Sequence, residues 1–395
     1  MSTNDLSRML LLTGAEAAAH AMRQINPDVV PIYPITPQTP IVQTFSKFVA
    51  DGKAHSEVIN VESEHSAMSV AIGAAASGAR TMTATASQGL ALMIENVYIA
   101  ASMRLPIVMA VGNRALSGPL NIHCDHSDGM LARDSGAVQV YVENAQEAYD
   151  FMILASKFAV DSRVLLPVMV CQDGFTLTHT AEPVELLEED EVQPFIGEYK
   201  IPYPLLDQSR VTTQGPFDMP DYYFEHKRQQ ADAMSEVPTV LLETARRFGE
   251  LCGRRYDIIE SYKLEDAERV IVVLGSTAGT VKDEVDELRA AGERVGLLRI
   301  LLFRPFPDKE VRQALRGALR VAVLDRAMSF GSFGPLFTEI CRALYGRSTA
   351  VQNYTFGLGG RDLYPEQVRK VFDDLKSIPG VYTAGHEMFY IGVRE

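Results

Sequence analysis

The sequence predicts an α/β protein, with a doubly wound parallel sheet in its first part and a smaller α/β domain in its second part. Two observations support this prediction. Short apolar runs alternate with segments of helical period from residue 1 to about 180, and the alternation returns after about residue 263. Most of these runs are apolar throughout rather than at every second residue, as in parallel strands that helices cover on both faces.

The strands expected in the first block are VVPIY, SEVINV, RTMTATA, PIVMAVGN, VQVYV and LLPVMVCQ. The helices expected between them are the segments EHSAMSVAIGAAASG, GLALMIENVYIAASM and AQEAYDFMILASKFAV. This alternation implies right-handed crossovers between parallel strands. Because ligands of open α/β sheets bind beyond the carboxyl ends of the strands, a site is expected in the loops that follow them.

The alternation breaks down between about residues 182 and 235, an acidic and proline-rich stretch that also contains Tyr, Phe and Leu. This composition predicts an extended connector that packs along its own domain or a neighbour. A helix is expected over about residues 237 to 263. The strands RVIVVLG, RVGLLRI and RVAVLD then accompany the helices AGTVKDEVDELRAAG, KEVRQALRG and PLFTEICRALYG. The predicted domains are residues 1–235, connector included, and residues 236–395.

The composition is that of a globular protein and argues against several classes of function. The 395 residues are 47% hydrophobic and 22% charged, with a net charge of −14. Nucleic acids and anionic membrane surfaces both attract basic proteins, so neither is an expected partner. No stretch approaches the ~20 apolar residues of a membrane span, and the first residues show no signal-peptide pattern. The four cysteines are far apart, which predicts a reducing cytoplasmic location.

The segment VVPIYPITPQTP, residues 29–40, is a stiff corner between an expected strand and an expected helix. Pro34 and Pro37 restrict the residues before them to extended backbone. Pro40 fits the first turn of the following helix, where its missing N–H costs little. Such a corner serves either as a turn alone or as a rigid support for Thr36.

Two charged residues follow expected strands. Glu64 lies where a strand ends and a helix begins, and a carboxylate in a first helical turn is well explained by the helix dipole alone. The Ala and Gly residues behind it also allow close packing, for instance of a flat ring. Arg114 lies in a long polar loop after the strand PIVMAV. It either holds that loop or binds a carboxylate through two parallel hydrogen bonds.

Other polar motifs give weaker signals. HCDHSD, residues 123–128, has the spacing of neither a structural zinc site nor a helical His-x3-His pair, and it predicts a hydrogen-bonded loop without a metal. GSTAGT opens a helix after a strand but matches no phosphate-binding motif. FGLGGRDL, residues 356–363, predicts a tight turn. The sequence has no Gly-Asp-Gly followed ~25–30 residues later by Asn, a pattern that would hold a magnesium diphosphate.

Eight motifs occur in order along nearly the whole chain: YPITPQTP, ESEHSAMS, TATASQGLALM, MRLPIVMAVGNRALSGP, DHSD, RDSG, LLPVMVCQDGFTLTHT and GLGGRD. Together they resemble the α subunit of pyruvate:ferredoxin oxidoreductase and of its 2-oxoacid:ferredoxin oxidoreductase relatives. The resemblance implies thiamine diphosphate-dependent oxidative decarboxylation of a 2-oxoacid to an acyl-CoA and CO₂, with electrons passing to ferredoxin. It also implies a pyrimidine-binding thiamine diphosphate domain followed by a domain like the carboxyl-terminal domain of transketolase.

The resemblance places the remaining machinery on β-, γ- and δ-type partner subunits. The diphosphate of the cofactor, its Mg²⁺ and the [4Fe-4S] clusters belong to those chains, in agreement with the missing Gly-Asp-Gly motif and the missing cysteine cluster. CoA is the co-substrate, and the expected assembly is a dimer of heteromers. Because ferredoxins are usually acidic and this chain carries −14, the electron acceptor is expected to dock on another subunit.

The resemblance also assigns roles to single residues. Glu64 matches the glutamate that contacts the pyrimidine nitrogen of thiamine diphosphate. A carboxylate there favours the imino tautomer of the ring, and this tautomer removes the proton from the thiazolium ring. Arg114 matches the arginine that binds the substrate carboxylate, and Thr36 matches a threonine whose hydroxyl reaches the same carboxylate. The residues expected beside the substrate are also Asn113 and Ile122, and those expected beside the cofactor are also Pro34, Ile35 and Gln88.

Pyruvate is the first expected substrate, because Thr36 and Arg114 suit a monocarboxylate. Pyruvate enzymes of the family often carry a bulky aromatic residue after the isoleucine of this loop, whereas here His123 follows Ile122. A smaller or more polar lining leaves a branched-chain or aryl 2-oxoacid open, such as 2-oxoisovalerate or phenylglyoxylate. Two functions of other classes stay as alternatives: an α/β protein that binds a nucleotide at GSTAGT, and a non-catalytic assembly subunit.

Overall fold

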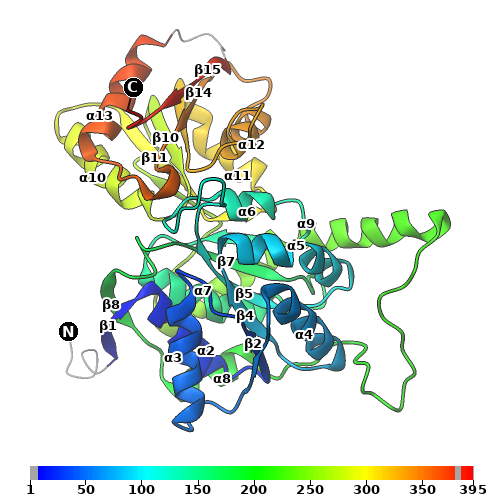
Figure 1. Cartoon of the computed structure of the whole chain (residues 1–395). Coiled ribbons are helices and arrows are strands. Elements are labelled where there is room, and N and C mark those ends of the chain that lie inside the picture. Colours follow the sequence, from blue (N-terminus) through cyan, green and yellow to red (C-terminus); the bar gives the residue numbers. More distant parts are fainter. Residues whose placement is uncertain (1–7, 379–383, 395) are drawn as a thin grey trace.

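The computed structural model describes residues 8–378 and 384–394 and confirms the α/β architecture (Figure 1). The elements of the first part are β1 (Met9–Thr13), α2 (Gly14–Ile25), β2 (Val29–Ile32), α3 (Thr39–Ala50), β3 (Glu57–Asn60), α4 (Glu64–Ser77), β4 (Met82–Thr85), α5 (Ser87–Ser102), β5 (Val108–Asn113), α6 (Ser127–Leu131), β6 (Val138–Tyr141), α7 (Ala145–Phe158), β7 (Val168–Asp173), β8 (Ala181–Glu185), α8 (Glu189–Ile196) and α9 (Pro220–Cys252).

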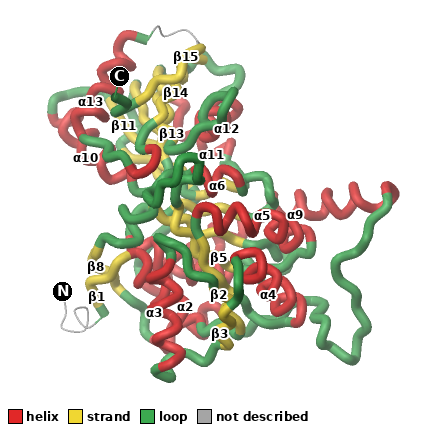
Figure 2. The backbone as a smooth tube through the Cα atoms, in the orientation of Figure 1, coloured by secondary structure: helices red, strands yellow, loops and turns green. Residues whose placement is uncertain are grey.

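The elements of the second part are β9 (Ile259–Tyr262), β10 (Arg269–Val273), α10 (Thr277–Ala290), β11 (Val295–Ile300), β12 (Leu302–Arg304), α11 (Asp308–Ala314), the 3₁₀ turn η1 (Leu315–Gly317), β13 (Arg320–Asp325), α12 (Pro335–Ala343), β14 (Ala350–Thr355), the 3₁₀ turn η2 (Leu358–Gly360), α13 (Pro365–Ser377) and β15 (Ala384–Tyr390). Figure 2 shows the strands inside and the helices around them. No described helix is long and apolar enough to cross a membrane.

The first sheet has the strand order β12-β6-β7-β5-β4, and its strands are parallel except β12. A parallel bridge between Val29 and Thr81 extends it through β2, which pairs with β3. The chain therefore leaves β2 toward β3 but leaves β4 toward β5, in opposite directions across the sheet. The loops after β2 and β4 diverge at this point, and a ligand crevice is expected beyond the carboxyl ends of these strands.

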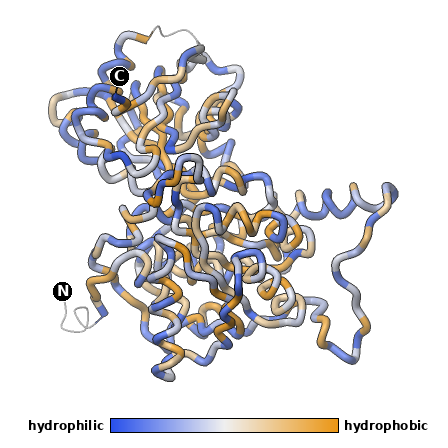
Figure 3. Tube along the Cα trace, in the orientation of Figure 1, coloured by the Kyte–Doolittle hydropathy of each residue, from blue (hydrophilic) through white to orange (hydrophobic). Residues whose placement is uncertain are grey.

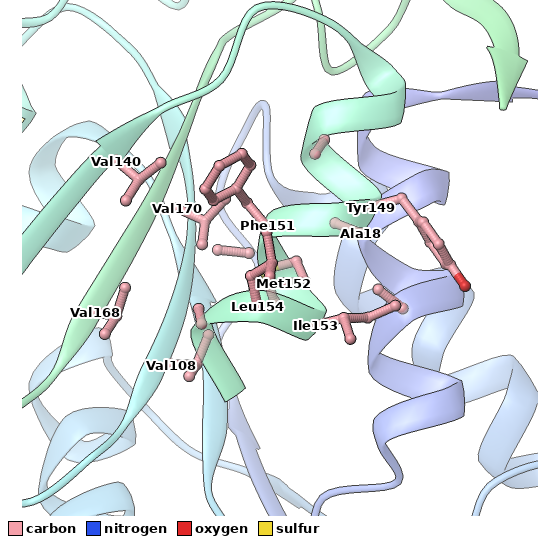
Figure 4. Packing of buried hydrophobic residues seen from close by; sticks show 14 of the residues in the cluster. Ala18, Val108, Val140, Tyr149, Phe151, Met152, Ile153, Leu154, Val168 and Val170 are labelled. Carbon is pink, nitrogen blue, oxygen red and sulfur yellow. The ribbon is translucent and has the colours of Figure 1, made fainter. Parts of the chain in front are cut away.

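Helices cover both faces of the first sheet. On one face α7 packs against the strands and α2 packs against α7 (Figure 4). On the other face α4 and α5 pack through residues such as Met68, Leu90 and Met93. Strands β4 to β7 are buried along their whole length. This double burial explains why they read as continuous apolar runs, and the strand predictions for the first block are confirmed. Figure 3 shows the hydrophobic residues gathered along these inner strands.

The second sheet has the strand order β15-β14-β13-β10-β11-β9, and only β9 is antiparallel. Helices α10 and α13 cover one face, and α11 and α12 cover the other. The short strand β12 leaves this part of the chain and pairs with β6 of the first sheet, where Leu302 lies opposite Val140. The two parts are therefore interlocked by a strand as well as packed together.

One buried carboxylate joins the carboxyl ends of the two sheets. Asp173 ends β7 and is 1% exposed. Its Oδ1 lies 2.7 Å from His126 Nε2, and its Oδ2 lies 2.9 Å from Arg326 Nη1 and accepts a hydrogen bond from Ser276 Oγ at 2.6 Å. Arg326 follows β13 and Ser276 precedes α10. Burial alone raises the pKa of Asp173, but the neighbouring His126 and Arg326 outweigh it and hold this pKa well below its usual value.

The stretch from 182 to 235 is more regular than predicted. β8 pairs with β1, α8 follows it after three residues, and the longest run with neither helix nor strand is residues 197–219. The prediction of an extended connector is therefore wrong for α8 and for the first half of α9. α9 begins at Pro220, a favoured first helical residue, and its polar first half runs into the buried positions Ala233 and Val237. Figure 1 shows residues before and within this first half projecting from the body.

The helix expected to reach residue 263 ends at Cys252. Gly253 adopts a left-handed conformation with φ 78°, and its N–H donates to the Gly249 carbonyl, which closes the helix. Residues Ile259–Tyr262 form β9 instead and pair with β11. The division of the chain between residues 235 and 236 stays a prediction, and α9 runs across this position.

Candidate active site

The corner after β2 is fixed against the sheet by the residues that follow Thr36. Pro37 packs on glycines, because a Cβ at Gly174 would lie 2.8 Å from Pro37 Cγ. Gln38 is fully buried, and its Nε2 donates to the Tyr33 carbonyl at 2.9 Å. Thr36 itself is exposed at the end of this rigid segment. The corner therefore presents Thr36 from a backbone that has little freedom.

Arg114, after β5, reaches this corner. Its Nη1 donates to the main-chain oxygen of Thr36 at 3.0 Å, and its Nε donates to the main-chain oxygen of Asn121 at 3.0 Å. The residue is 7% exposed. Among residues 8–378 and 384–394, no carboxylate lies within ion-pair distance of this guanidinium, and Nη2 has no hydrogen-bond partner. Arg326, by contrast, is paired with Asp173. Arg114 is thus a buried positive charge that a ligand carboxylate can compensate.

Glu64 lies at the first residue of α4, behind the N-cap Ser63. Its side chain is 6% exposed and faces the first turn of α5. A Cβ at Gly89 would lie 2.7 Å from Glu64 Oε1 and 2.6 Å from Thr85 Oγ1, so only glycine allows this approach. Thr85 Oγ1 is buried and has no hydrogen-bond partner within the described chain. A carboxylate and an unpartnered buried hydroxyl therefore lie together at the carboxyl end of β4.

Asp128 locks the loops that follow β4 and β5. Its Oδ2 accepts hydrogen bonds from the main-chain N–H groups of Ser87 at 2.9 Å and Arg114 at 3.0 Å. Its Oδ1 accepts one from Asn113 Nδ2 at 2.8 Å. Burial raises the pKa of Asp128 to about 6, although these hydrogen bonds act to lower it. Asp128 thereby fixes the backbone from which Arg114 extends and the point where α5 begins.

The structure brings Thr36 and Arg114 together and places Glu64 with the first turn of α5. Asn113 is fully buried on Asp128, while Ile122 is 41% exposed in the loop after β5. The residues expected beside the cofactor differ in burial: Pro34 is exposed, and Ile35 and Gln88 are half-buried. Their binding roles stay predictions.

Sequence reasoning missed Asp128, Thr85 and Gly89. Each lies inside one of the eight motifs. The roles of Asp128 and Gly89, however, come from contacts with segments elsewhere in the chain.

The loop HCDHSD takes part in one cluster with ligand-type atoms. Cys124, His126 and Asp173 each offer one such atom, and these atoms lie within 4.8 Å of one another. The Arg326 guanidinium already pairs with Asp173, and a cation would meet its repulsion. Burial also raises the pKa of the Cys124 thiol well above its usual value, which disfavours the thiolate that a metal needs. That this loop binds no metal stays a prediction.

The variant Asp128→Asn tests how Asp128 stabilises the loops after β4 and β5, and its effect on the free energy of unfolding is expected to depend on pH. The folded pKa of about 6 exceeds the unfolded value of 3.8, so the folded state holds this proton more tightly, and stability from this group falls as the pH rises from about 4 to about 6. The stability advantage of wild type over Asp128→Asn is therefore expected to shrink by on the order of 3 kcal/mol across this range, at ~1.4 kcal/mol per tenfold change in proton affinity. Urea unfolding at several pH values measures it.

The exposed Asp134→Asn is the matched control for this variant, because Asp134 lies in the same segment and its side chain is 71% exposed. Its stability difference from wild type is expected to stay small throughout. A difference for Asp128→Asn that is equally constant between pH 4 and pH 7 contradicts the prediction.

Comparison with known families matches residues 20–246 to the thiamine diphosphate-binding domain of pyruvate flavodoxin/ferredoxin oxidoreductases, and residues 267–368 to core domain II of pyruvate:ferredoxin oxidoreductase. Pyruvate synthase subunit PorA of Thermotoga maritima is 57% identical over 97% of this chain and 98% of its own. PorA of Methanocaldococcus jannaschii is 48% identical over 93% of this chain and 94% of its own. Ketoisovalerate oxidoreductase subunit VorA of Pyrococcus abyssi is 42% identical over 93% of each chain.

Two solved structures share the fold. The 2-oxoglutarate:ferredoxin oxidoreductase from Magnetococcus marinus, with 2-oxoglutarate, coenzyme A and succinyl-CoA bound, has a TM-score of 0.74 at 20% identity, covering 93% of this chain and 65% of that chain. A split-gene transketolase, in an inactive β4 tetramer, has a TM-score of 0.56 at 14% identity, and the match covers 92% of this chain and 98% of that chain. The predicted fold class and the predicted family are thus confirmed: this chain belongs to the thiamine diphosphate-binding pyruvate flavodoxin/ferredoxin oxidoreductase family.

Proposed function

We propose that this chain is the α-type subunit of a pyruvate:ferredoxin oxidoreductase, which converts a 2-oxoacid and CoA to an acyl-CoA, CO₂, a proton and two electrons. The observation that carries the proposal is Arg114, a buried guanidinium that has carbonyl oxygens as its partners and, within the described residues, no carboxylate. Its natural counter-charge is the carboxylate of the substrate. The pyruvate synthase relatives support pyruvate as that substrate.

The residues around Glu64 fit the aminopyrimidine ring of thiamine diphosphate. Glu64 offers a carboxylate, Thr85 offers a buried hydroxyl without a partner, and Gly89 leaves the wall between them without a side chain. When bound, this cofactor supplies the electron sink that decarboxylation of a 2-oxoacid requires. Three further residues from the corner and from α5 complete the wall in this proposal: Pro34, Ile35 and Gln88.

Glu64 and Arg114 then have separate tasks. Glu64 would hold the aminopyrimidine ring through a hydrogen bond to a ring nitrogen, and a carboxylate there would favour the tautomer that the cofactor needs to act as a base. Arg114 uses Nη2 to bind the substrate carboxylate, and the Thr36 hydroxyl reaches the same group. Because Nε and Nη1 are already held by main-chain oxygens, the guanidinium has one orientation before the substrate arrives.

The acyl side of the substrate faces the loop after β5 in this proposal, beside Ile122 and Asn113. Ile122 is 41% exposed and is followed by His123 rather than by a bulky aromatic residue. The VorA relative, named for ketoisovalerate, makes a branched-chain 2-oxoacid the second candidate. An aryl 2-oxoacid is the third.

Partner subunits supply the rest of the reaction. We assign the diphosphate-binding Mg²⁺ and the [4Fe-4S] clusters to β-, γ- and δ-type chains, because the sequence lacks the magnesium motif and its four cysteines are scattered. Ferredoxin, or another acceptor, docks on such a chain, since this one carries −14. The assembly is a cytoplasmic dimer of heteromers in which CoA is the co-substrate.

A panel of 2-oxoacids tests the proposed function directly. In the purified complex, pyruvate is expected to give the highest kcat/KM for acceptor reduction, followed by 2-oxoisovalerate and phenylglyoxylate, and steady turnover is expected to require CoA. A preference for 2-oxoisovalerate would show that the second candidate, a branched-chain 2-oxoacid, is the substrate. Tight binding of NAD or ATP by the isolated chain, together with a complex inactive on all three acids, contradicts the proposal.

Glu64→Gln tests the proton-sharing carboxylate. The amide cannot accept and return the proton, so kcat is expected to fall by roughly 10²- to 10⁴-fold, the usual range for a lost general acid–base group. Assembly of the complex is expected to persist. Glu62→Gln, two residues earlier and exposed, is the control and retains kcat within about twofold. Equal rates for the two variants in steady-state assays contradict the role of Glu64.

A further inference from the structure

We propose that the glycine turn, residues 357–360 of the second part, is a positioning element for the substrate loop, residues 114–126 of the first part, and thereby helps to select the 2-oxoacid. The sequence predicted a tight turn at FGLGGRDL and gave it no function. The inference rests on the proposed substrate contact of Arg114 and extends it to a segment more than 230 positions away in the sequence.

The glycine turn makes three hydrogen bonds to the middle of the substrate loop. The Gly360 N–H donates to the Cys124 carbonyl at 2.7 Å. Asn121 Nδ2 donates to the Gly359 carbonyl at 3.1 Å, and the Gly359 N–H donates to Asp125 Oδ2 at 3.4 Å. The loop has no helix or strand of its own up to Ser127, so these bonds replace the regular structure that it lacks.

Asn121 links the glycine turn to Arg114. Its side chain binds the turn, and its main-chain oxygen accepts the hydrogen bond from Arg114 Nε at 3.0 Å. Its Oδ1 also accepts from the His123 N–H at 2.6 Å. Ile122 therefore lies between Asn121, which binds the turn, and His123, whose N–H is bound to Asn121. A displacement of the turn is expected to move both the guanidinium that binds the carboxylate and the side chain proposed to face the acyl group.

The two ends of the substrate loop bind residues that lie outside the glycine turn. At one end the Arg114 N–H is bound to Asp128. At the other end the His126 N–H donates to the Arg326 carbonyl at 2.8 Å, and its ring pairs with Asp173. The turn bonds directly to the loop only at its middle, residues 121–125, where the Ala115 N–H also donates to the His123 carbonyl at 3.0 Å. The Gly357 carbonyl of the turn accepts a hydrogen bond from Nε of the anchor Arg326 at 3.3 Å. A change at the turn is thus expected to shift the middle of the loop without releasing its ends.

Glycine is required at two positions for steric reasons. Gly359 and Gly360 have φ values of 61° and 81°, which side-chain-bearing residues rarely adopt. In addition, a Cβ at Gly360 would lie 2.3 Å from His123 Cβ, and one at Gly359 would lie 2.5 Å from Asn121 Nδ2. The first of these neighbours is the root of a side chain and cannot move without the backbone. A methyl group at Gly360 therefore pushes the substrate loop away.

The chain offers a matched control in Gly331. Its φ of 82° is nearly that of Gly360, it lies in another loop of the second part, and a Cβ there meets nothing within 4 Å. Gly331→Ala carries the same backbone strain as Gly360→Ala but none of the crowding. The difference between the two variants isolates the contact with the substrate loop.

The experiment measures kcat and KM of the assembled complex for pyruvate and 2-oxoisovalerate in five forms: wild type, Gly360→Ala, Gly331→Ala, Arg114→Lys and the double variant of Gly360 and Arg114. Gly360→Ala is expected to raise KM for pyruvate by roughly 10- to 100-fold, since ~1 Å of misplacement costs on the order of 10²-fold. Its kcat is expected to stay within about threefold, and the ratio of kcat/KM for the two acids is expected to change. Gly331→Ala is expected to retain all values within about twofold.

The double variant shows whether the turn acts through Arg114. Arg114→Lys alone is expected to raise KM, and adding Gly360→Ala is then expected to have little further effect, because coupled residues are not additive. Equal KM values for Gly360→Ala and Gly331→Ala, with a raised KM for Arg114→Lys, overturn the positioning role and leave the proposed function intact. An unchanged KM for Arg114→Lys overturns the proposed contact itself.

If Gly360→Ala does not assemble, Asn121→Ala takes its place. It removes the hydrogen bond to the Gly359 carbonyl, together with the one from the His123 N–H, without adding an atom. A KM for pyruvate raised several-fold at nearly unchanged kcat supports the proposal, and a wild-type KM overturns it.

Discussion

The buried carboxylate of Asp173 is the interaction on which the arrangement of this molecule depends. It ends a strand of the first sheet and pairs with Arg326 after a strand of the second, so the carboxyl ends of both sheets face each other. A buried charge of this kind is tolerated only when it is paired and hydrogen-bonded, and removal of one partner is costly. Because His126 shares the same carboxylate, the contact that joins the two parts also anchors one end of the substrate loop.

The candidate site is built from short irregular segments on a rigid sheet. Prolines and a buried glutamine stiffen the corner that carries Thr36, and Asp128 ties the loop of Arg114 to the start of α5. Glu64 approaches that helix only because residue 89 is glycine. The Arg114 guanidinium is therefore held before any ligand binds, which lowers the entropy that binding and catalysis must overcome.

The sequence predicted what depends on local pattern. Strands buried on both faces read as apolar runs, and eight ordered motifs identified the family. The roles that the same motifs assign to Thr36, Glu64 and Arg114 stay predictions. The contributions of Asp128, Gly89 and Gly360 could not be predicted, because each depends on a contact between segments that are distant in sequence. The three-residue strand β12 and the polar first half of α9 carry too weak a periodic signal, and tertiary packing decides their structure.

The proposed site joins two chemistries, a carboxylate for the cofactor ring and an arginine for the substrate. The most direct test is an experimental structure of the assembled enzyme with thiamine diphosphate and an unreactive pyruvate analogue. Glu64 is expected about 3 Å from a nitrogen of the aminopyrimidine ring, and Arg114 Nη2 about 3 Å from a carboxylate oxygen of the analogue. An Arg114 paired instead with a carboxylate of the protein, and a Glu64 turned away from the ring, would contradict this description of the site.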